Sequence, residues 1–281
     1  MKQIGRPNTS ANKVIQYKLN DGQWQTWDLS AVSLADGDKM YLKSDDEIPV
    51  SEVYITYKNF VMTGSIAASG NIMSLLNFSD TLTNYAFYKL FYQCSSLTQA
   101  PELPATTLAE KCYSNMFSSC SSLTQAHALP ATTLADSCYS DMFKGCSSLT
   151  KAPELPATTL APSCYSNMFK ECKSLVNAPA LPASTLDVEC YSSMFYGCTL
   201  LVNAPELPAT TLANYCYNSM FRGCTKLNYV KAMFINNVDF NGHLSTWLAN
   251  VSPTGTFIKS KDATWTNEQA GIPEGWTVET V

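Results

Sequence analysis

The chain has 281 residues, of which 46% are hydrophobic and only 15% are charged. This apolar share predicts a folded protein, and the low charge means that Ser, Thr and Asn supply much of the surface polarity. The formal net charge is −5, from 18 Lys and Arg against 23 Asp and Glu. With no basic cluster in the sequence, binding to nucleic acid is not expected. No apolar run approaches the roughly 18 residues that would predict insertion into a membrane.

The first part of the chain, residues 1–62, is expected to form a small antiparallel β module. Residues 1–13 read as a polar lead-in, and the turn Asn20-Asp21-Gly22 is typical of a hairpin. The strands are expected at residues 14–19, 23–27, 32–34, 40–42 and 53–57.

Aromatic residues of this module allow two interpretations. They could form a binding face, as in carbohydrate modules, but in a domain of this size aromatic side chains are more often core. The four residues are Trp24, Trp27, Tyr41 and Tyr57.

A strict 26-residue period governs the middle of the chain. Leu, Tyr, Met, Phe and Cys each recur at this spacing, and a fixed period of this length is typical of a solenoid. We therefore predict an α/β repeat solenoid of the leucine-rich-repeat type, with one helix and one short strand in each repeat. The period is seen most simply in Cys94, Cys120, Cys146, Cys172, Cys198 and Cys224.

Residues 109–120 illustrate the helix that is expected in each repeat. Thr107 and Glu110 fit a capping box before it, and Pro162 fits the first turn of a later copy. A short strand is expected around residues 98–100, followed by an extended Pro-rich turn. The apolar stripe that predicts the helix consists of Cys112, Tyr113, Met116, Phe117 and Cys120.

Less regular segments flank the repeats. Residues 63–94 are expected to form an N-terminal cap and a degenerate first repeat, residues 95–228 the solenoid, and residues 229–281 a degenerate last repeat and C-terminal cap. Within this last segment, Leu244, Trp247 and Leu248 match Tyr217, Met220 and Phe221 at an offset of 27, which predicts one inserted residue and a capping helix. A strand is expected at 254–259 and a tail at 277–281. The residues expected to fold over the end are Trp265, Ile272, Pro273 and Trp276.

All eleven cysteines belong to the repeat, at the positions of Cys112 and Cys120. Eight residues along a helix separate two side chains by about 12 Å, which is too far for a disulfide within one repeat. Their spacing does not exclude pairing between repeats. The odd count and the regular ladder favour buried free thiols that act as small apolar side chains.

The sequence offers little for catalysis. His127 and His243 are the only histidines, and no zinc, phosphate-binding or hydrolase motif is present. Glu102, Glu154 and Glu206 recur at one site but lie two repeats apart. We therefore expect no enzyme activity, no catalytic residue, no bound metal and no cofactor.

Variable polar positions are the candidate binding residues. In solenoids the strand-lined face usually binds ligands, and a regular row of amides and isolated charges would suit a repetitive ligand such as a polysaccharide. The alternative is that near-identical repeats reflect recent duplication of a spacer. The candidate residues are Gln99, Glu102, Gln125, Lys151, Glu154, Asn177, Asn203 and Glu206.

The stretch Met142-Phe143-Lys144-Gly145-Cys146-Ser147-Ser148-Leu149-Thr150 resembles the Ala-Phe-x-Gly-Cys-x-x-Leu core of the BspA-like leucine-rich repeats. The longer variant seen here also carries Leu-Pro-Ala-Thr-Thr-Leu, and the resemblance covers roughly residues 75–250. It implies a non-catalytic surface or extracellular protein that binds or adheres to host proteins, other cells or glycans. Such proteins are common in anaerobic gut bacteria, protists and some phages.

The N-terminus does not resemble a signal peptide, and no anchor is recognisable. This favours, as an alternative, a structural or receptor-binding fibre component of a phage or other large assembly. In that case the location would be the virion, the N-terminal module would dock to the assembly, and the repeats would be a spacer.

Overall fold

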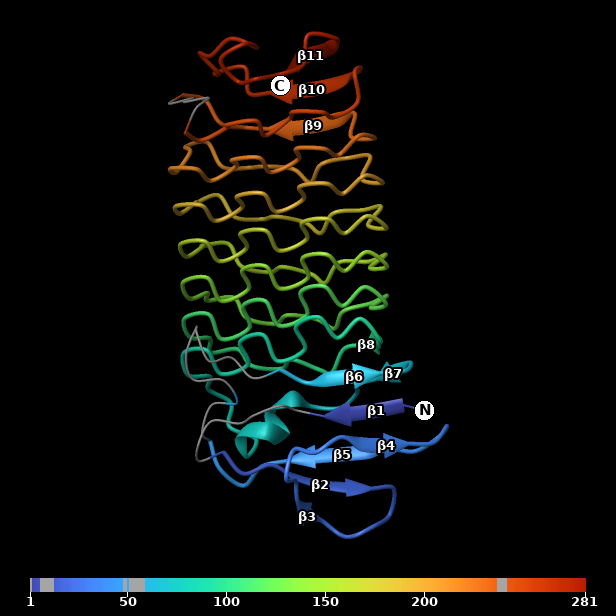
Figure 1. Cartoon of the computed structure of the whole chain (residues 1–281). Helices are drawn as coiled ribbons and strands as arrows, with labels where there is room; N and C mark the ends of the chain where they lie inside the picture. The colour runs from blue at the N-terminus through green and yellow to red at the C-terminus, as the bar shows by residue number, and fades with distance from the viewer. Residues whose placement is uncertain (1, 6–12, 48–49, 51–58, 237–241) are drawn as a thin grey trace.

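Residues 2–5, 13–47, 50, 59–236 and 242–281 are described in the structure, which is a computed structural model. Coils of similar shape stack into an elongated body, with the N-terminal strands at one end and the C-terminal strands at the other (Figure 1). Buried side chains of successive coils form one hydrophobic core that runs through the stack. Each coil therefore buries its apolar residues against its neighbours, as the 26-residue period predicts.

The expected α/β class is wrong, because the repeats contain no helix. Within the described ranges the one helical element is the 3-10 helix η1 (Ile72–Leu76), which precedes the repeats. Residues 109–120 form consecutive turns instead of the expected helix. The strand of each repeat is also short. Only β8 (Leu97–Gln99) is a regular strand among the repeats up to residue 228, and later coils keep isolated bridges.

Hydrogen bonding explains why the turn segment is not helical. The Cys112 N–H donates to the Ala109 carbonyl at 3.2 Å and closes a turn, whereas the Tyr113 N–H donates to the Cys138 carbonyl of the next coil at 3.1 Å. This alternation continues along the segment, so that every second N–H leaves its own coil. A helix would need these groups for its own bonds. The donors that cross to the next coil are Lys111, Tyr113, Asn115, Phe117 and Ser119.

Every fourth residue of the turn segment has a left-handed backbone. The φ angle is +51° at Lys111, +56° at Asn115 and +64° at Ser119. Each occupies the third position of a turn, where a type II turn requires positive φ. A right-handed helix cannot contain such residues at this spacing. Glycine, which adopts this conformation without strain, occupies the third of these positions in several later coils: Gly145, Gly197 and Gly223.

The beginning of the turn segment also differs from a helix N-terminus. The Glu110 N–H donates to the Asn84 side-chain oxygen at 3.2 Å, so the expected capping box with Thr107 does not describe this site. Pro162 occupies the equivalent of Glu110 two coils later, and its carbonyl accepts a hydrogen bond from the Ser137 N–H at 2.9 Å. A proline is tolerated there because its carbonyl is the group that the preceding coil uses.

Identical aromatic side chains stack in two rows through the core. The Tyr113 and Tyr139 ring centroids are 5.9 Å apart with an interplanar angle of 1°, and those of Phe117 and Phe143 are 5.6 Å apart at 7°. Centroids at this separation with parallel planes indicate offset stacking, a favourable arrangement for aromatic pairs. The rows continue through Tyr165, Tyr191 and Tyr217 and through Phe169, Phe195 and Phe221.

All eleven cysteines are free and buried, as the sequence predicts. One of the two cysteine rows also has a polar role that the sequence does not reveal. The Cys120 thiol donates to the Phe91 carbonyl at 3.0 Å, and the same carbonyl accepts the Cys94 N–H at 3.0 Å. This arrangement recurs for Cys146, Cys172, Cys198 and Cys224. The thiol row therefore adds a weak side-chain bond between neighbouring coils.

Two antiparallel sheets precede the coils, each of three strands. The orders are β4-β1-β6 and β3-β2-β5, and the hairpin expected around Asn20 is present as β2 and β3. The expectation of a loose lead-in at residues 1–13 is wrong in part, because β1 is the central strand of its sheet. The expected strand at 53–57 lies outside the described residues. The bounds are β1 Lys2–Gly5, β2 Gln16–Leu19, β3 Gln25–Thr26, β4 Val32–Leu34, β5 Met40–Lys43 and β6 Val61–Thr63. β7 (Ile66–Ala67) then pairs in parallel with β8.

A three-stranded parallel sheet closes the other end of the stack. It contains β9 (Tyr229–Ala232), β10 (Gly255–Lys259) and β11 (Trp276–Thr280), in the order β11-β10-β9. The strand expected at 254–259 is thus confirmed, whereas the expected tail at 277–281 is largely strand β11. Of the residues expected to cover this end, Trp265, Ile272 and Trp276 are buried and Pro273 is half-buried.

The expected insertion before Leu244 is also visible in the hydrogen bonds. The Tyr217 N–H donates to the His243 carbonyl, 26 residues later, whereas the Tyr191 N–H donates to the Cys216 carbonyl, 25 residues later. Turns replace the expected capping helix here. The Trp247 indole is fully buried and stacks against Tyr217 at 6.2 Å, so this side chain ends the tyrosine row.

Substitution of Gly145 distinguishes the turn stack from a helix. At this residue φ is +72°, and the atom nearest to an added Cβ would be the Ser119 hydroxyl oxygen, at 3.4 Å. We expect Gly145→Ala to lower the free energy of unfolding by about 1–2 kcal/mol, the cost of a left-handed backbone. In a helix the same change would raise it by about 1 kcal/mol. Chemical denaturation measures the sign of this change in the free energy of unfolding. Glu171→Gly, at the equivalent position of the next coil, is the control and is expected to be neutral or stabilising.

The buried thiols predict a loss of stability at alkaline pH. Burial raises the pKa of Cys94 and of Cys146 to about 12. In the unfolded chain these thiols ionise at about pH 8.5. The free energy of unfolding should therefore fall as pH rises from there toward 12, by about 1.4 kcal/mol per pH unit for each such thiol.

Urea denaturation under reducing conditions, carried out below and above the pH at which the unfolded thiols ionise, measures this change in the free energy of unfolding. A variant with Cys138, Cys164 and Cys190 replaced by Ala should show a shallower slope. Stability that does not change between neutral and alkaline pH would show that the thiols are not protonated and buried in the folded protein.

Candidate functional site

The eight binding residues expected from the sequence are all exposed. Five of them occupy equivalent positions of successive coils, and we call them the coil row: Gln99, Gln125, Lys151, Asn177 and Asn203. Parallel bridges join Gln125 to Lys151 and Lys151 to Asn177. Because paired strands lie about 4.8 Å apart, the row presents side chains at about this interval. The structure therefore brings together residues that are far apart in the sequence.

The glutamates lie three residues further along their coils and are less closely grouped. Glu154 is two coils from Glu102 and two from Glu206, which places their backbones on the order of 10 Å apart. The Glu206 carboxylate pairs with the Lys231 ammonium at 2.9 Å. This separation does not suit an acid and base acting on one bond.

Exposed hydroxyl residues also repeat along the stack, at positions outside the eight that the sequence predicts to bind. Two consecutive hydroxyl residues follow an alanine in each repeat, and no hydrogen bond from these side chains is found among the described residues. The positions are Thr106 and Thr107, Thr132 and Thr133, Thr158 and Thr159, Ser184 and Thr185, and Thr210 and Thr211. Their regular recurrence in an exposed position was the signal available in the sequence. They add uncharged hydroxyl groups to the outside of the stack.

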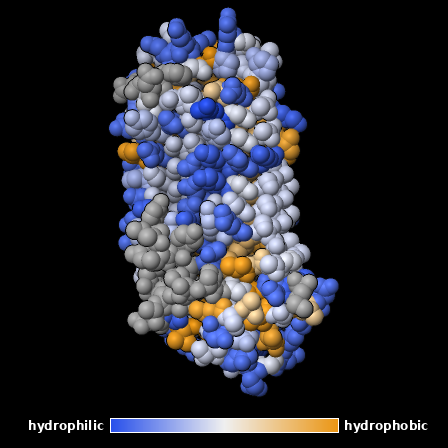
Figure 2. Space-filling model, in the orientation of Figure 1, coloured by the Kyte–Doolittle hydropathy of each residue, from blue (hydrophilic) through white to orange (hydrophobic). Residues whose placement is uncertain are grey.

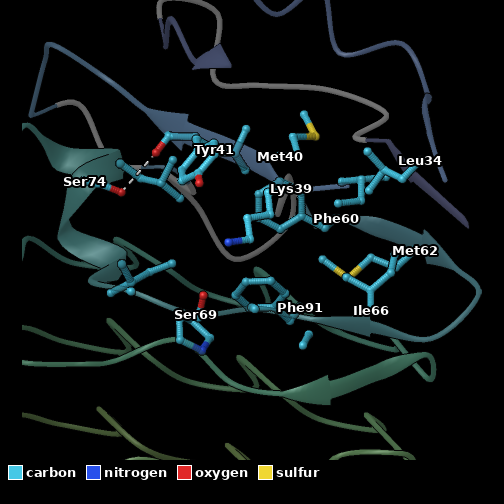
Figure 3. Close-up of a pocket in the computed structure, with 18 of the residues that line it drawn as sticks. Leu34, Lys39, Met40, Tyr41, Phe60, Met62, Ile66, Ser69, Ser74 and Phe91 are labelled. Atoms are coloured by element: carbon cyan, nitrogen blue, oxygen red, sulfur yellow. Dashed lines mark hydrogen bonds between the residues drawn. The ribbon is translucent and has the colours of Figure 1, made fainter. Parts of the chain in front are cut away.

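A second candidate site is a cleft at the N-terminal end (Figure 3), with a volume of about 1130 Å³. It is lined by residues of β1, β4, β5, β6, β7, η1 and β8, and of the loops beside them. Buried side chains that line it include Leu34, Phe60, Ile66 and Phe91. Figure 2 shows apolar surface on the same end of the molecule. Because the cleft results from the packing of distant segments, no local sequence pattern predicts it.

The aromatic residues of the N-terminal module divide between core and surface. Trp27 is buried, and its indole N–H donates to the Ser30 carbonyl at 3.0 Å. Trp24 and Tyr41 are each 41% exposed and line the cleft. The core interpretation is therefore right for Trp27 and wrong for these two, while Tyr57 lies outside the described residues.

Lysines surround the exposed aromatic residues. The Lys18 ammonium lies 4.8 Å from the Tyr41 ring centroid and 5.6 Å from that of Trp24, within the range of a cation–π contact. The Lys43 ammonium lies 5.2 Å from the Trp24 centroid and pairs with Asp45 at 3.1 Å. This side of the cleft thus combines aromatic surface with positive charge.

Asp38 also lines the cleft, but its carboxylate is engaged by the protein. It accepts hydrogen bonds from the Asn20 side-chain amide at 3.0 Å and from the Ala35 N–H at 2.8 Å. These bonds, that of Asn20 first, hold the pKa of Asp38 below its usual value. The carboxylate therefore serves the turn before β5 and is a poor candidate for an acid.

The part of the chain that the structure describes has no cluster of three or more metal-binding side chains. His127 and His243 are both half-buried and lie in different parts of the stack. Likewise, no helix among the described residues is long and apolar enough to cross a membrane.

The chain matches no protein-family model, no curated protein and no solved structure. Its function must therefore be inferred from the coil row and the N-terminal cleft.

Proposed function

We propose that this protein is a non-catalytic binding or adhesion protein, exposed at a cell surface or outside the cell, that recognises a glycan or host protein through its stacked coils. The observation that carries the proposal is the coil row, in which polar side chains of successive coils are exposed and in register. The resemblance of the repeats to BspA-like sequences supports the same function. A repetitive ligand could contact equivalent side chains on several coils at once.

The bonding between coils supports this proposal energetically. Each coil bonds to the next through five N–H groups of the turn segment, and two aromatic rows stack in the core. A surface held in this way loses little conformational freedom when a ligand binds. Several weak contacts made in parallel can then give useful affinity, because one ligand chain links them.

The chemistry of the row favours a ligand with little charge. Four of the five positions carry an amide, which can both donate and accept hydrogen bonds, and Lys151 is the exception. The threonine hydroxyls that repeat in the coils are also exposed and uncharged. A glycan, with a hydroxyl group on most carbons, offers complementary donors and acceptors at short intervals.

Removal of the amides tests the proposal. The unchanged chain is first screened on an array of glycans and host matrix proteins. A variant with Gln99, Gln125, Asn177 and Asn203 replaced by Ala should no longer bind the ligands found in this way. A matched variant with the exposed turn residues Asp136 and Glu189 replaced by Ala should bind as before. Equal binding by the two variants would contradict recognition through the coil row.

The second candidate function is a structural or receptor-binding component of a larger assembly, with the coils as a spacer. It is favoured by the cleft and the exposed aromatic residues at one end of the stack, which offer an attachment surface remote from most of the coils. Full retention of binding by the four-residue variant would support this alternative.

A further inference from the structure

We propose that the N-terminal cleft binds an amphipathic acid, with an aliphatic or aromatic body on the apolar floor and an anionic head at the Lys39 ammonium. The cleft adjoins the first position of the coil row, since Thr98 and Pro101 line it on either side of Gln99. The proposal nevertheless does not depend on the function proposed for the coils.

The floor of the cleft fits an apolar body. Besides its buried side chains, the cleft is lined by the partly buried Met40, Leu42 and Met62. Methionine side chains adapt to the shape of a ligand because they are flexible and polarizable. The volume of about 1130 Å³ lies slightly above the range typical of small-molecule sites.

Phe78 is an independent sign that this apolar surface has a use. Its side chain is 65% exposed at the edge of the cleft, and its φ angle is +57°. Exposed apolar side chains gathered at one place often mark a surface that binds a ligand. The Phe78 N–H donates to the Met73 carbonyl at 2.8 Å, which holds this residue in place.

Lys39 provides the positive charge. Figure 3 shows its ammonium ending in the open part of the cleft, between Tyr41 and Ser69. No ion pair of this group is found among the described residues, whereas two other lysines of the lining, Lys2 and Lys43, pair with aspartates. An ammonium above an apolar floor favours a ligand that carries an anion at one end, because a charge-assisted hydrogen bond can form there.

A sugar suits this cleft less well than an amphipathic acid does. The floor offers methyl, thioether and aromatic groups, which cannot pair with the hydroxyl groups that a sugar would bury. Burial of such unpaired hydroxyls is unfavourable. The chemistry of the cleft therefore differs from that of the coil row, with its amides and hydroxyls.

Calorimetric titration of the full chain with dodecanoate, kept below its micelle concentration, tests the proposal. We expect one molecule to bind per chain. Lys39→Met should weaken binding about tenfold or more, the factor expected for a lost bond to a charged group. Lys261→Met, at an exposed lysine of the C-terminal region, is the matched control and should bind as the unchanged protein does.

Two further probes separate the contribution of the anionic head to binding from that of the apolar body. Dodecanol, which lacks the charge, should bind the unchanged protein and Lys39→Met equally. Phe78→Ser should weaken both ligands by a similar factor, and its exposed position makes it compatible with folding.

The proposal is overturned by either of two results. The first is that dodecanoate does not bind, even if vesicles of anionic lipid or an acidic peptide do bind. The second is that dodecanoate binds Lys39→Met as tightly as it binds the unchanged protein.

Discussion

The structure depends on a backbone that divides its hydrogen bonds between two coils. In the turn segment one N–H closes a turn and the next N–H reaches the following coil, and this alternation requires a left-handed residue at every fourth position. Buried peptide groups are satisfied in this way without helix or regular sheet. Left-handed residues other than glycine, such as Lys111 and Asn115, are strained, so the bonds and the packing between coils must offset that strain.

This constraint explains the regularity of the sequence. Since each coil bonds to its neighbour at a fixed offset, a shift by one residue would misalign the tyrosine, phenylalanine and cysteine rows together. The one inserted residue lies before Leu244, where the coils end and the C-terminal sheet begins. The same regularity repeats the outer side chains at the coil interval, and the proposed recognition by the coil row uses this repetition. The cleft is formed instead where the two antiparallel sheets meet the first coils.

The sequence predicts the stacking, the buried rows and the exposure of the polar positions, because the period makes all coils equivalent. It fails at the local conformation. Cys112, Tyr113, Met116 and Phe117 suit one face of a helix, but pairs of apolar residues repeating every four positions suit a turn stack equally well. Asp141 and Gly145, in the columns between those pairs, were the available signal, since both residue types tolerate positive φ.

Other features depend on contacts between segments far apart in the chain. Lys2–Gly5 has little apolar patterning, and it becomes a central strand because β4 and β6 pair with it from both sides. In the same way, the exposure of Trp24 and Tyr41 and the position of Lys39 in the cleft follow from how the sheets pack on the coils. Local sequence patterns do not carry this information.

Far-ultraviolet circular dichroism of the intact chain tests the central claim most directly. If consecutive turns joined by bonds between coils form the repeats, the spectrum will lack the double minimum of α-helix. A strong helical spectrum, at the level expected from one helix in each repeat, would contradict the turn stack and restore the α/β class.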